Sequence, residues 1–448
     1  MHNHGCKLRH NVKRHRSNWP ACIVSLKLQK RPSQSSAPAA ALWQMETLDK
    51  FGLAHCDLPT MMWNVAVMLR VVAVKIEGGA TSIPIFFYLL ATVAIVLYFF
   101  NYYASMLVFV LVGCRETGDI LAGIMVLSIS MNSLIGINKL FYIYRHQDKV
   151  QSLVADYVAY DRIAPWAGTS ALMAEHMRSV KKRLILFWTV TMGNAIIFNL
   201  QPLVMPSRLN LYDKHVTYGL KFILGITNYP IAIVNIVACT FFICYITSSI
   251  GGLLIVTTGY SEGRLLALSQ EMQDLWSDAH KHYSENFEGD SEDKKAAKEL
   301  NNYVNYRLQV IVKSHAINID VIKKLEGIFR NAIAVEFILL TAGLSIDLLG
   351  GLEDTYIILP FSLMQVGMDC YLGQKLMDAC KVFEDAIYDC KWENFDVKNR
   401  KTVLLMLKIS QRTLSLSAGG VATLSFECLM AMYKAVYSAY TALRSTME

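Results

Sequence analysis

Two residues of opposite charge, Glu427 and Lys434, lie in the last apolar stretch of the sequence. They are seven positions apart, about two helical turns, so a helix would place them on one face. Charged residues within a membrane-spanning helix often mark an ion pathway. The chemistry open to this pair is therefore to line or shape a polar path for ions. Pairing with a neighbouring helix, or solvation at the membrane surface, is the alternative.

Two further acids, Glu336 and Asp369, fall in weaker apolar stretches, close to the predicted helix ends. Solvation by water is the expected state of both side chains. Lys139 and Arg330 also fall within predicted helices.

Aromatic and methionine side chains are abundant, with 22 Tyr, 19 Phe, 7 Trp and 20 Met. An apolar pocket with few polar groups suits a small hydrophobic ligand. Helix geometry nominates seven residues in the outer halves of predicted spans for such a pocket, with helix packing as the alternative for each: Met125, Trp188, Met192, Phe198, Tyr229, Phe361 and Gln365.

Motifs of enzymes and metal sites are missing from the sequence. It has no P-loop, no Gly-x-Gly-x-x-Gly after a strand, no His-Glu-x-x-His and no Gly-x-Ser-x-Gly. Its ten cysteines form no Cys-x-x-Cys pair, and Cys380 and Cys390 have no histidine at zinc-ligand spacing. The sequence therefore predicts no catalytic residues, no metal site and no cofactor.

The composition is that of a multi-span membrane protein. Of 448 residues, 54% are hydrophobic and only 18% are charged, and the mean hydropathy is +0.32. Soluble domains are about 25% charged. Soluble enzymes, disordered scaffolds and nucleic-acid-binding proteins are therefore excluded as classes.

Seven apolar stretches are long enough to cross a bilayer, which needs about 20 residues per helix. The predicted fold is all-α, and the spans are Ala80–Cys114, Ile120–Asn138, Leu184–Ser207, Phe222–Ser261, Asn331–Leu349, Thr355–Leu376 and Leu414–Leu443.

The distribution of Lys and Arg between the loops predicts the orientation. With the N-terminus in the cytoplasm, the inner segments hold 35 basic residues and the outer segments hold five. Basic residues favour the cytoplasmic side. The N-terminus is therefore expected inside and the C-terminus outside, which is opposite to a G-protein-coupled receptor. Asp-Arg-Tyr and Asn-Pro-x-x-Tyr motifs are absent as well, and this class is excluded.

Residues 1–44 form a tail that carries eight basic residues and no acidic ones, which accounts for the net charge of +7. Its polar, Ser- and Pro-rich composition predicts disorder. The change of composition at Met45 leads to the hypothesis that translation starts there.

A series of motifs near the C-terminus resembles the insect odorant receptor family. The series is Tyr371-Leu372-Gly373-Gln374-Lys375-Leu376, Asp385-Ala386-Ile387-Tyr388 with Trp392, Ser417-Ala418-Gly419, Leu424-Ser425-Phe426-Glu427, Lys434, Tyr437-Ser438 and Leu443-Arg444. Over the rest of the chain the resemblance rests on topology, length and loop sizes.

The resemblance implies an odorant-gated, non-selective cation channel that needs no G protein. A ligand-tuning subunit would assemble with the odorant receptor co-receptor as a heterotetramer in the cell membrane of an olfactory neuron dendrite. Glu427, Lys434, Tyr437 and Ser438 would belong to the pore helix. A small hydrophobic volatile would bind among spans two to six.

The composition, the apolar stretches and the resemblance together predict an order of segments along the chain. These are the tail (1–44), a cytoplasmic amphipathic segment (45–82), helices one to four (83–256), a cytoplasmic anchor region (257–327), helices five and six (328–377), a second anchor region (378–413) and pore helix seven (414–443). Interfacial helices lying on the bilayer are the alternative for the anchor regions.

Three other functions stay open at this point. A gustatory-type receptor channel fits less well because the last-helix motifs are of the odorant type. A secondary transporter would show matched broken helices in two halves. A membrane interaction protein without signalling would leave the pore-helix motifs unexplained.

Overall fold

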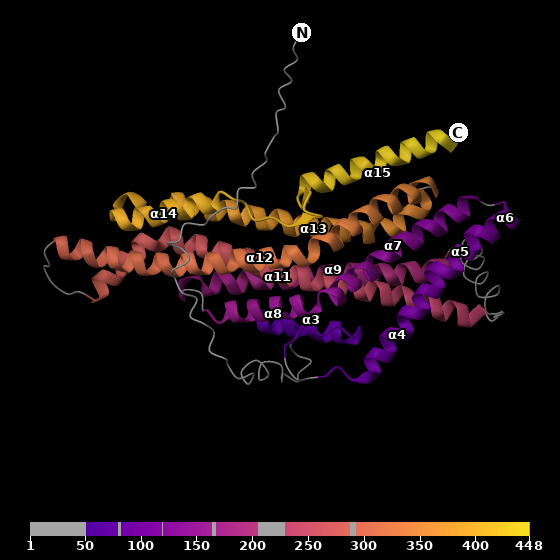
Figure 1. Cartoon of the computed structure of the whole chain (residues 1–448), viewed down its shortest axis with the longest axis horizontal. Coiled ribbons are helices and arrows are strands. Elements are labelled where there is room, and N and C mark those ends of the chain that lie inside the picture. The colour runs from indigo at the N-terminus through magenta and orange to yellow at the C-terminus, as the bar shows by residue number, and fades with distance from the viewer. Residues whose placement is uncertain are drawn as a thin grey trace, which may run out of the picture. The chain divides into compact units, whose positions relative to one another are not determined.

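The computed structural model describes residues 51–78, 82–118, 120–163, 167–204, 229–286, 293–350 and 352–447. These residues are almost entirely helical (Figure 1). The tail of residues 1–44 and the proposed start at Met45 lie outside the described residues.

The first helices begin at clear sequence signals. Helix α3 (Leu58–Val71) follows Asp57, whose side chain accepts a hydrogen bond from the backbone N–H of Thr60 at 3.0 Å. Such a cap satisfies a helix N–H that has no partner within the helix. The next helical segment is continuous. It consists of α4 (Ile85–Phe99), η2 (Phe100–Ser105), α5 (Met106–Val108), η3 (Phe109–Gly113) and α6 (Cys114–Thr117). It ends where Gly118 adopts a positive φ of 68°.

Long helices follow, joined by shorter elements. They are α7 (Ile120–Arg145), α8 (Gln147–Asp161), η4 (Ala167–Thr169), α9 (Ser170–Val204), α11 (Tyr229–Asn286), α12 (Asp293–Gly350), α13 (Leu352–Tyr388), η5 (Trp392–Asn394), α14 (Val397–Ser410) and α15 (Phe426–Met447).

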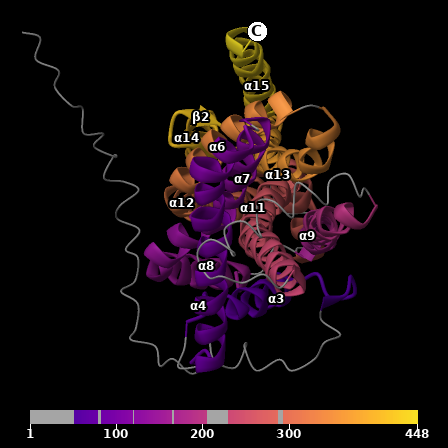
Figure 2. The ribbon, with the colours of Figure 1, turned by 90° about the vertical axis from the view of Figure 1, so that its right-hand side faces the viewer.

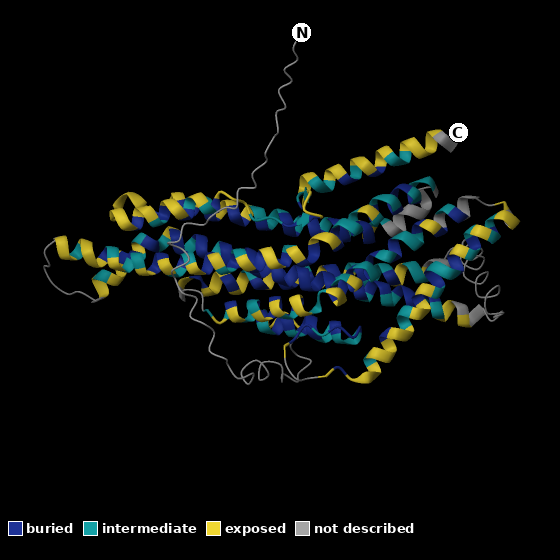
Figure 3. Cartoon of the chain, viewed as in Figure 1, coloured by how far each residue is buried: buried dark blue, intermediate teal, exposed yellow. Residues whose placement is uncertain are grey.

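Helix α11 lies in the middle of the bundle and contacts α3, α7, α9, α12 and α13 (Figure 2). Its residues from 246 to 268 are almost all buried (Figure 3). Helix α4 shows the opposite pattern, because only Ala91 and Tyr98 are buried and Ile85, Phe86 and Leu89 are exposed. Exposed apolar side chains on such a helix are suited to contact with lipid rather than with water.

Among the described residues, five helical segments are long and apolar enough to cross a membrane. They are Ile85–Glu116, Val126–Arg145, Ser170–Leu200, Ile233–Glu285 and Lys294–Leu349. Helices α13 and α15 complete the seven predicted spans. Helix α13 packs on α9, α11 and α12, and α15 packs on α12 and α13.

Several helices are longer than the predicted spans. Both α11 and α12 contain 58 residues, so both helices continue beyond the predicted spans into the predicted anchor region of residues 257–327. Helix α9 begins at Ser170, before the predicted span Leu184–Ser207, and continues through Pro202 to Val204. The predicted span termini at residues 80, 207 and 222 lie outside the described residues.

The prediction that the last helix begins at Leu414 is wrong. A hairpin precedes the helix, in which β1 (Ser417–Ala418) pairs with β2 (Ala422–Thr423), and α15 starts at Phe426. Gly419 and Gly420 form the turn with φ of 66° and 77°. A left-handed pair of this kind is costly for other residues and stops a helix. Because apolar residues flank the two glycines, the predicted span extended across them.

Candidate pore helix and buried polar site

The four predicted pore residues all lie on the exposed side of α15. Glu427, Lys434, Tyr437 and Ser438 are exposed, and 66% of the surface of Tyr437 is accessible. At 100° per residue, Glu427, Lys434 and Ser438 follow one line along the helix. A polar and charged stripe therefore points away from the bundle of its own chain.

The opposite side of α15 is apolar and packs into the bundle. Met432 and Val436 are buried in a cluster that includes Leu340, Leu344 and Val366. The hydroxyl of Ser345 on α12 donates to the backbone oxygen of Val436 at 3.4 Å. The helix thus has one face fixed by packing and one face that is exposed among the described residues.

The motifs that carry the family resemblance meet at the first turn of α15. Gln374 on α13 accepts a hydrogen bond from the backbone N–H of Phe426 at 3.4 Å. A Cβ atom at Gly373 would overlap the carbonyl oxygen of Leu424. On the other side, Ser417 of β1 donates to Glu326 of α12 at 2.6 Å. Residues separated by up to 100 positions therefore hold the start of the candidate pore helix.

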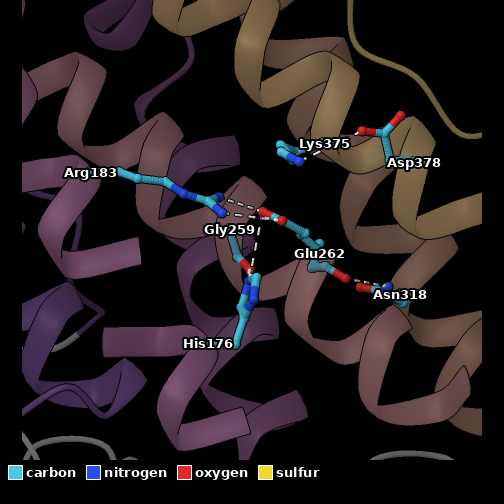
Figure 4. A network of polar contacts seen from close by, with 8 residues as sticks. His176, Arg183, Gly259, Glu262, Asn318, Lys375 and Asp378 are labelled. Carbon is cyan, nitrogen blue, oxygen red and sulfur yellow. Dashed lines mark hydrogen bonds and ion pairs between the residues drawn. The ribbon is translucent and has the colours of Figure 1, made fainter. Parts of the chain in front are cut away.

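A polar network connects α13, near the start of α15, to α9 and α11 (Figure 4). Arg183 on α9 donates to Glu262 on α11 at 2.6 Å, and its guanidinium lies 5.1 Å from the ring centre of Tyr371 on α13. His176 contacts the backbone oxygen of Gly259 at 3.0 Å. Arg183 thereby links three helices.

A second polar site lies inside the bundle. Lys139 on α7 contacts Glu336 on α12 at 2.8 Å and Asp369 on α13 at 3.7 Å. All three residues are at most 3% exposed. The amide oxygen of Gln365 accepts a hydrogen bond from Lys139 at 3.3 Å. We call Lys139, Glu336 and Asp369 the buried triad.

The expectation that Glu336 and Asp369 are solvated is wrong. It placed both residues near helix ends, but α12 begins at Asp293 and α13 continues to Tyr388. Both acids are therefore well inside their helices. The signal that could have identified the site was a lysine, Lys139, directly after one predicted span and acids within two others.

The predicted pocket residues are only partly brought together. Trp188, Met192 and Phe198 lie on α9, and Phe361 and Gln365 lie on α13. Met192 packs against the cluster that contains Phe361 and the α15 residue Met432. Met125 lies on α7 and Tyr229 begins α11, but their side chains are not among those described. The pocket stays a prediction.

An apolar groove of about 480 Å³ lies elsewhere, between α12 and α15. Its lining includes Phe337, Thr341 and Ser345 on α12 and Ala439 and Leu443 on α15. None of the five predicted pocket residues whose side chains are described lines this groove.

Comparison with curated proteins identifies relatives from Drosophila melanogaster. The chain is 26% identical to Odorant receptor 22c over 248 residues, which cover 51% of this chain and 58% of that protein. It is 23% identical to Odorant receptor 22a over 142 residues, covering 30% of this chain and 36% of that protein. The chain thus spans about a third to three fifths of the length of these relatives.

The fold is similar to that of the insect olfactory receptor OR5 from Machilis hrabei. The superposition has a TM-score of 0.68 and covers 86% of this chain and 98% of that receptor, at 12% identity. The structure of the same receptor in complex with eugenol gives a TM-score of 0.66, with 87% of this chain and 98% of that receptor covered at 11% identity. The seven-helix, all-α architecture is therefore shared.

The sequence model described as 7tm Odorant receptor matches residues 119–437, which include α7 to α14 and the first half of α15. This match covers more than half of the chain, and it contains the buried triad and the first turns of the candidate pore helix. The chain belongs to the 7tm Odorant receptor family.

Proposed function

We propose that this chain is the ligand-tuning subunit of an odorant-gated, non-selective cation channel. It acts in the cell membrane with the N-terminus in the cytoplasm, and it has no enzymatic activity. Its partner is the odorant receptor co-receptor, in a heterotetramer. Its ligand is a small hydrophobic volatile, in line with the eugenol held by the Machilis receptor.

The observation that carries this proposal is the charged face of α15. A charged side chain facing the centre of a bilayer costs about 2.5–3.5 kcal/mol on insertion scales. Glu427 and Lys434 point away from the bundle, so a stable arrangement in the membrane places them against water or another subunit. A ring of subunits around a water-filled axis satisfies both requirements.

The test is whole-cell current in a heterologous cell, with and without the co-receptor, across a panel of volatiles. We expect an inward cation current that needs both subunits and persists when G-protein signalling is blocked. Tracer flux without current would instead indicate a transporter. No current from receptor that has reached the cell surface would contradict the proposal.

Charge variants of α15 test the pore assignment directly. Glu427→Gln should lower the single-channel conductance and Lys434→Gln should raise it, each about twofold. A unit charge about 8 Å from an ion in water contributes roughly 0.5 kcal/mol, which is a factor of about two in local cation concentration. Lys401→Gln, which removes a positive charge from the exposed surface of α14, is the matched control. Equal conductance in all three variants would exclude α15 from the pore.

A further inference from the structure

The amide of Gln365 is held in one orientation by the buried triad. Its oxygen Oε1 accepts a hydrogen bond from the ammonium of Lys139 at 3.3 Å. That ammonium is itself fixed by Glu336 at 2.8 Å. Rotating the amide by half a turn would place its NH₂ group against an ammonium, which has donors only. The oxygen therefore faces Lys139 and the nitrogen faces away.

The nitrogen Nε2 of Gln365 is a buried donor without a partner among the described residues. The residue is fully buried, and Nε2 has no hydrogen bond to any of the described residues. A buried donor that is left unpaired loses the hydrogen bonds that it made in water. An acceptor that reaches this nitrogen is bound more tightly than an apolar group of the same size.

Along α13, Gln365 has an apolar residue one turn before it and a charged residue one turn after it. Phe361 lies one turn before Gln365 on α13, and Asp369 of the buried triad lies one turn after it. Phe361 and the next residue, Val366, belong to the apolar cluster against which Met192 packs. The amide is thus the polar group at the edge of an apolar region that also contains two predicted pocket residues.

The geometry points to Gln365 as a specificity-determining residue that selects volatiles with an acceptor oxygen, such as ketones and esters, over hydrocarbons. The inference rests on the proposed function and names the chemical class of its ligand. Lys139 is a positioning residue in this arrangement, because it sets the direction of the amide without contacting the ligand.

A site that is built to donate a hydrogen bond discriminates against ligands that lack the acceptor. The test compares methyl ketones and ethyl esters with hydrocarbons of the same chain length, as concentration–response curves of co-receptor-dependent current. The readout is the ratio of half-maximal concentrations within each pair. Comparing this ratio between wild type and variant cancels the different partitioning of the two compounds into membranes.

We expect Gln365→Leu to raise the half-maximal concentration for the ketone or ester about tenfold, with little change for the hydrocarbon. A tenfold change corresponds to about 1.4 kcal/mol. Gln411→Leu, at an exposed position after α14, is the matched control and should keep the wild-type ratio. Gln365→Met is a second variant of similar length, and the hydrocarbon current reports whether either variant is folded and delivered.

Several outcomes overturn the assignment. An unchanged ratio in both Gln365 variants shows that the donor is not used. Loss of both currents from variants that reach the cell surface shows that Gln365 supports the fold rather than selecting the ligand. The buried ring N–H of Trp188 also lacks a partner among the described residues. If the preference for the ketone or ester is lost in Trp188→Phe but kept in Gln365→Leu, Trp188 is the donor that selects the ligand. If the wild-type receptor gives no current with any volatile, the result contradicts the proposed function rather than the role of Gln365.

Discussion

At the scale of single residues, the buried triad holds two carboxylates around one ammonium. Lys139 is 2.8 Å from Glu336 and 3.7 Å from Asp369, so Glu336 has the stronger contact. Removing one member of a buried ion pair leaves a charge without compensation. The effect of each substitution therefore depends on which sign of charge remains.

Lys139→Met should lower the free energy of unfolding by about 3–5 kcal/mol, because two buried carboxylates lose their only cation in the triad. Asp369→Asn should cost much less, because it leaves one ammonium and one carboxylate. Thermal midpoints of the purified receptor in detergent measure both changes. Lys323→Met, at an exposed position on α12, is the control. Equal midpoints for the two Met variants would show that the triad does not stabilise the fold.

A buried histidine in the first half of α12, outside the predicted span Asn331–Leu349, predicts a pH dependence. His315 is 7% exposed and its ring centre lies 4.6 Å from that of Phe383. Burial lowers the pKa of His315 to about 4, compared with about 6.5 in an unfolded chain. Protonation therefore favours unfolding, and this contribution to stability is complete above about pH 6.5 and decreases as the pH falls toward 4.

We expect wild type to lose about 2 kcal/mol more stability between pH 6.5 and 5 than His315→Leu, from a slope of about 1.4 kcal/mol per pH unit. Thermal midpoints at several pH values measure the difference. His55→Gln, at an exposed histidine, should keep the wild-type slope. Parallel pH curves for wild type and His315→Leu would assign the acid sensitivity to other groups.

At the scale of elements, the close approach of α13 to the residues before α15 is the contact that holds the start of α15. Gly373 leaves no room for a Cβ atom, whereas nothing lies within 4 Å of a Cβ at Gly367 on the same helix. These two glycines allow one substitution to be tested in opposite environments.

Gly373→Ala should cost about 1–3 kcal/mol, because α13 and the backbone at Leu424 must separate. Gly367→Ala should stabilise α13 by up to about 1 kcal/mol, through the higher helix propensity of alanine. Thermal midpoints measure stability. The open probability at saturating ligand measures whether the contact between α13 and Leu424 affects channel gating. Similar effects of both substitutions would mean that helix propensity, not the contact, decides the outcome.

The elements also differ in how well the sequence predicts them. Long apolar runs predicted the membrane helices, because each helix in a bilayer must satisfy its own backbone. The hairpin before α15 was missed because Gly419 and Gly420 sit within an apolar run. The triad was missed because its members lie 197 and 33 positions apart, and only the packing of three helices brings them together.

At the scale of the whole molecule, composition alone identified the protein class and the motif series identified the family. The pocket could not be derived in the same way. Its residues come from several helices, and their contacts depend on the rotation of each helix about its axis. A single sequence constrains that rotation weakly when most faces are apolar.

The unbroken length of α11 and α12 has a mechanical consequence. At 1.5 Å per residue, a helix of 58 residues is about 87 Å long, nearly three times the thickness of the hydrocarbon core. A stiff rod of this length acts as a lever. A tilt of about 5° about one end would displace the other end of such a helix by roughly 8 Å, so the length of the helix enlarges a small local displacement at its far end.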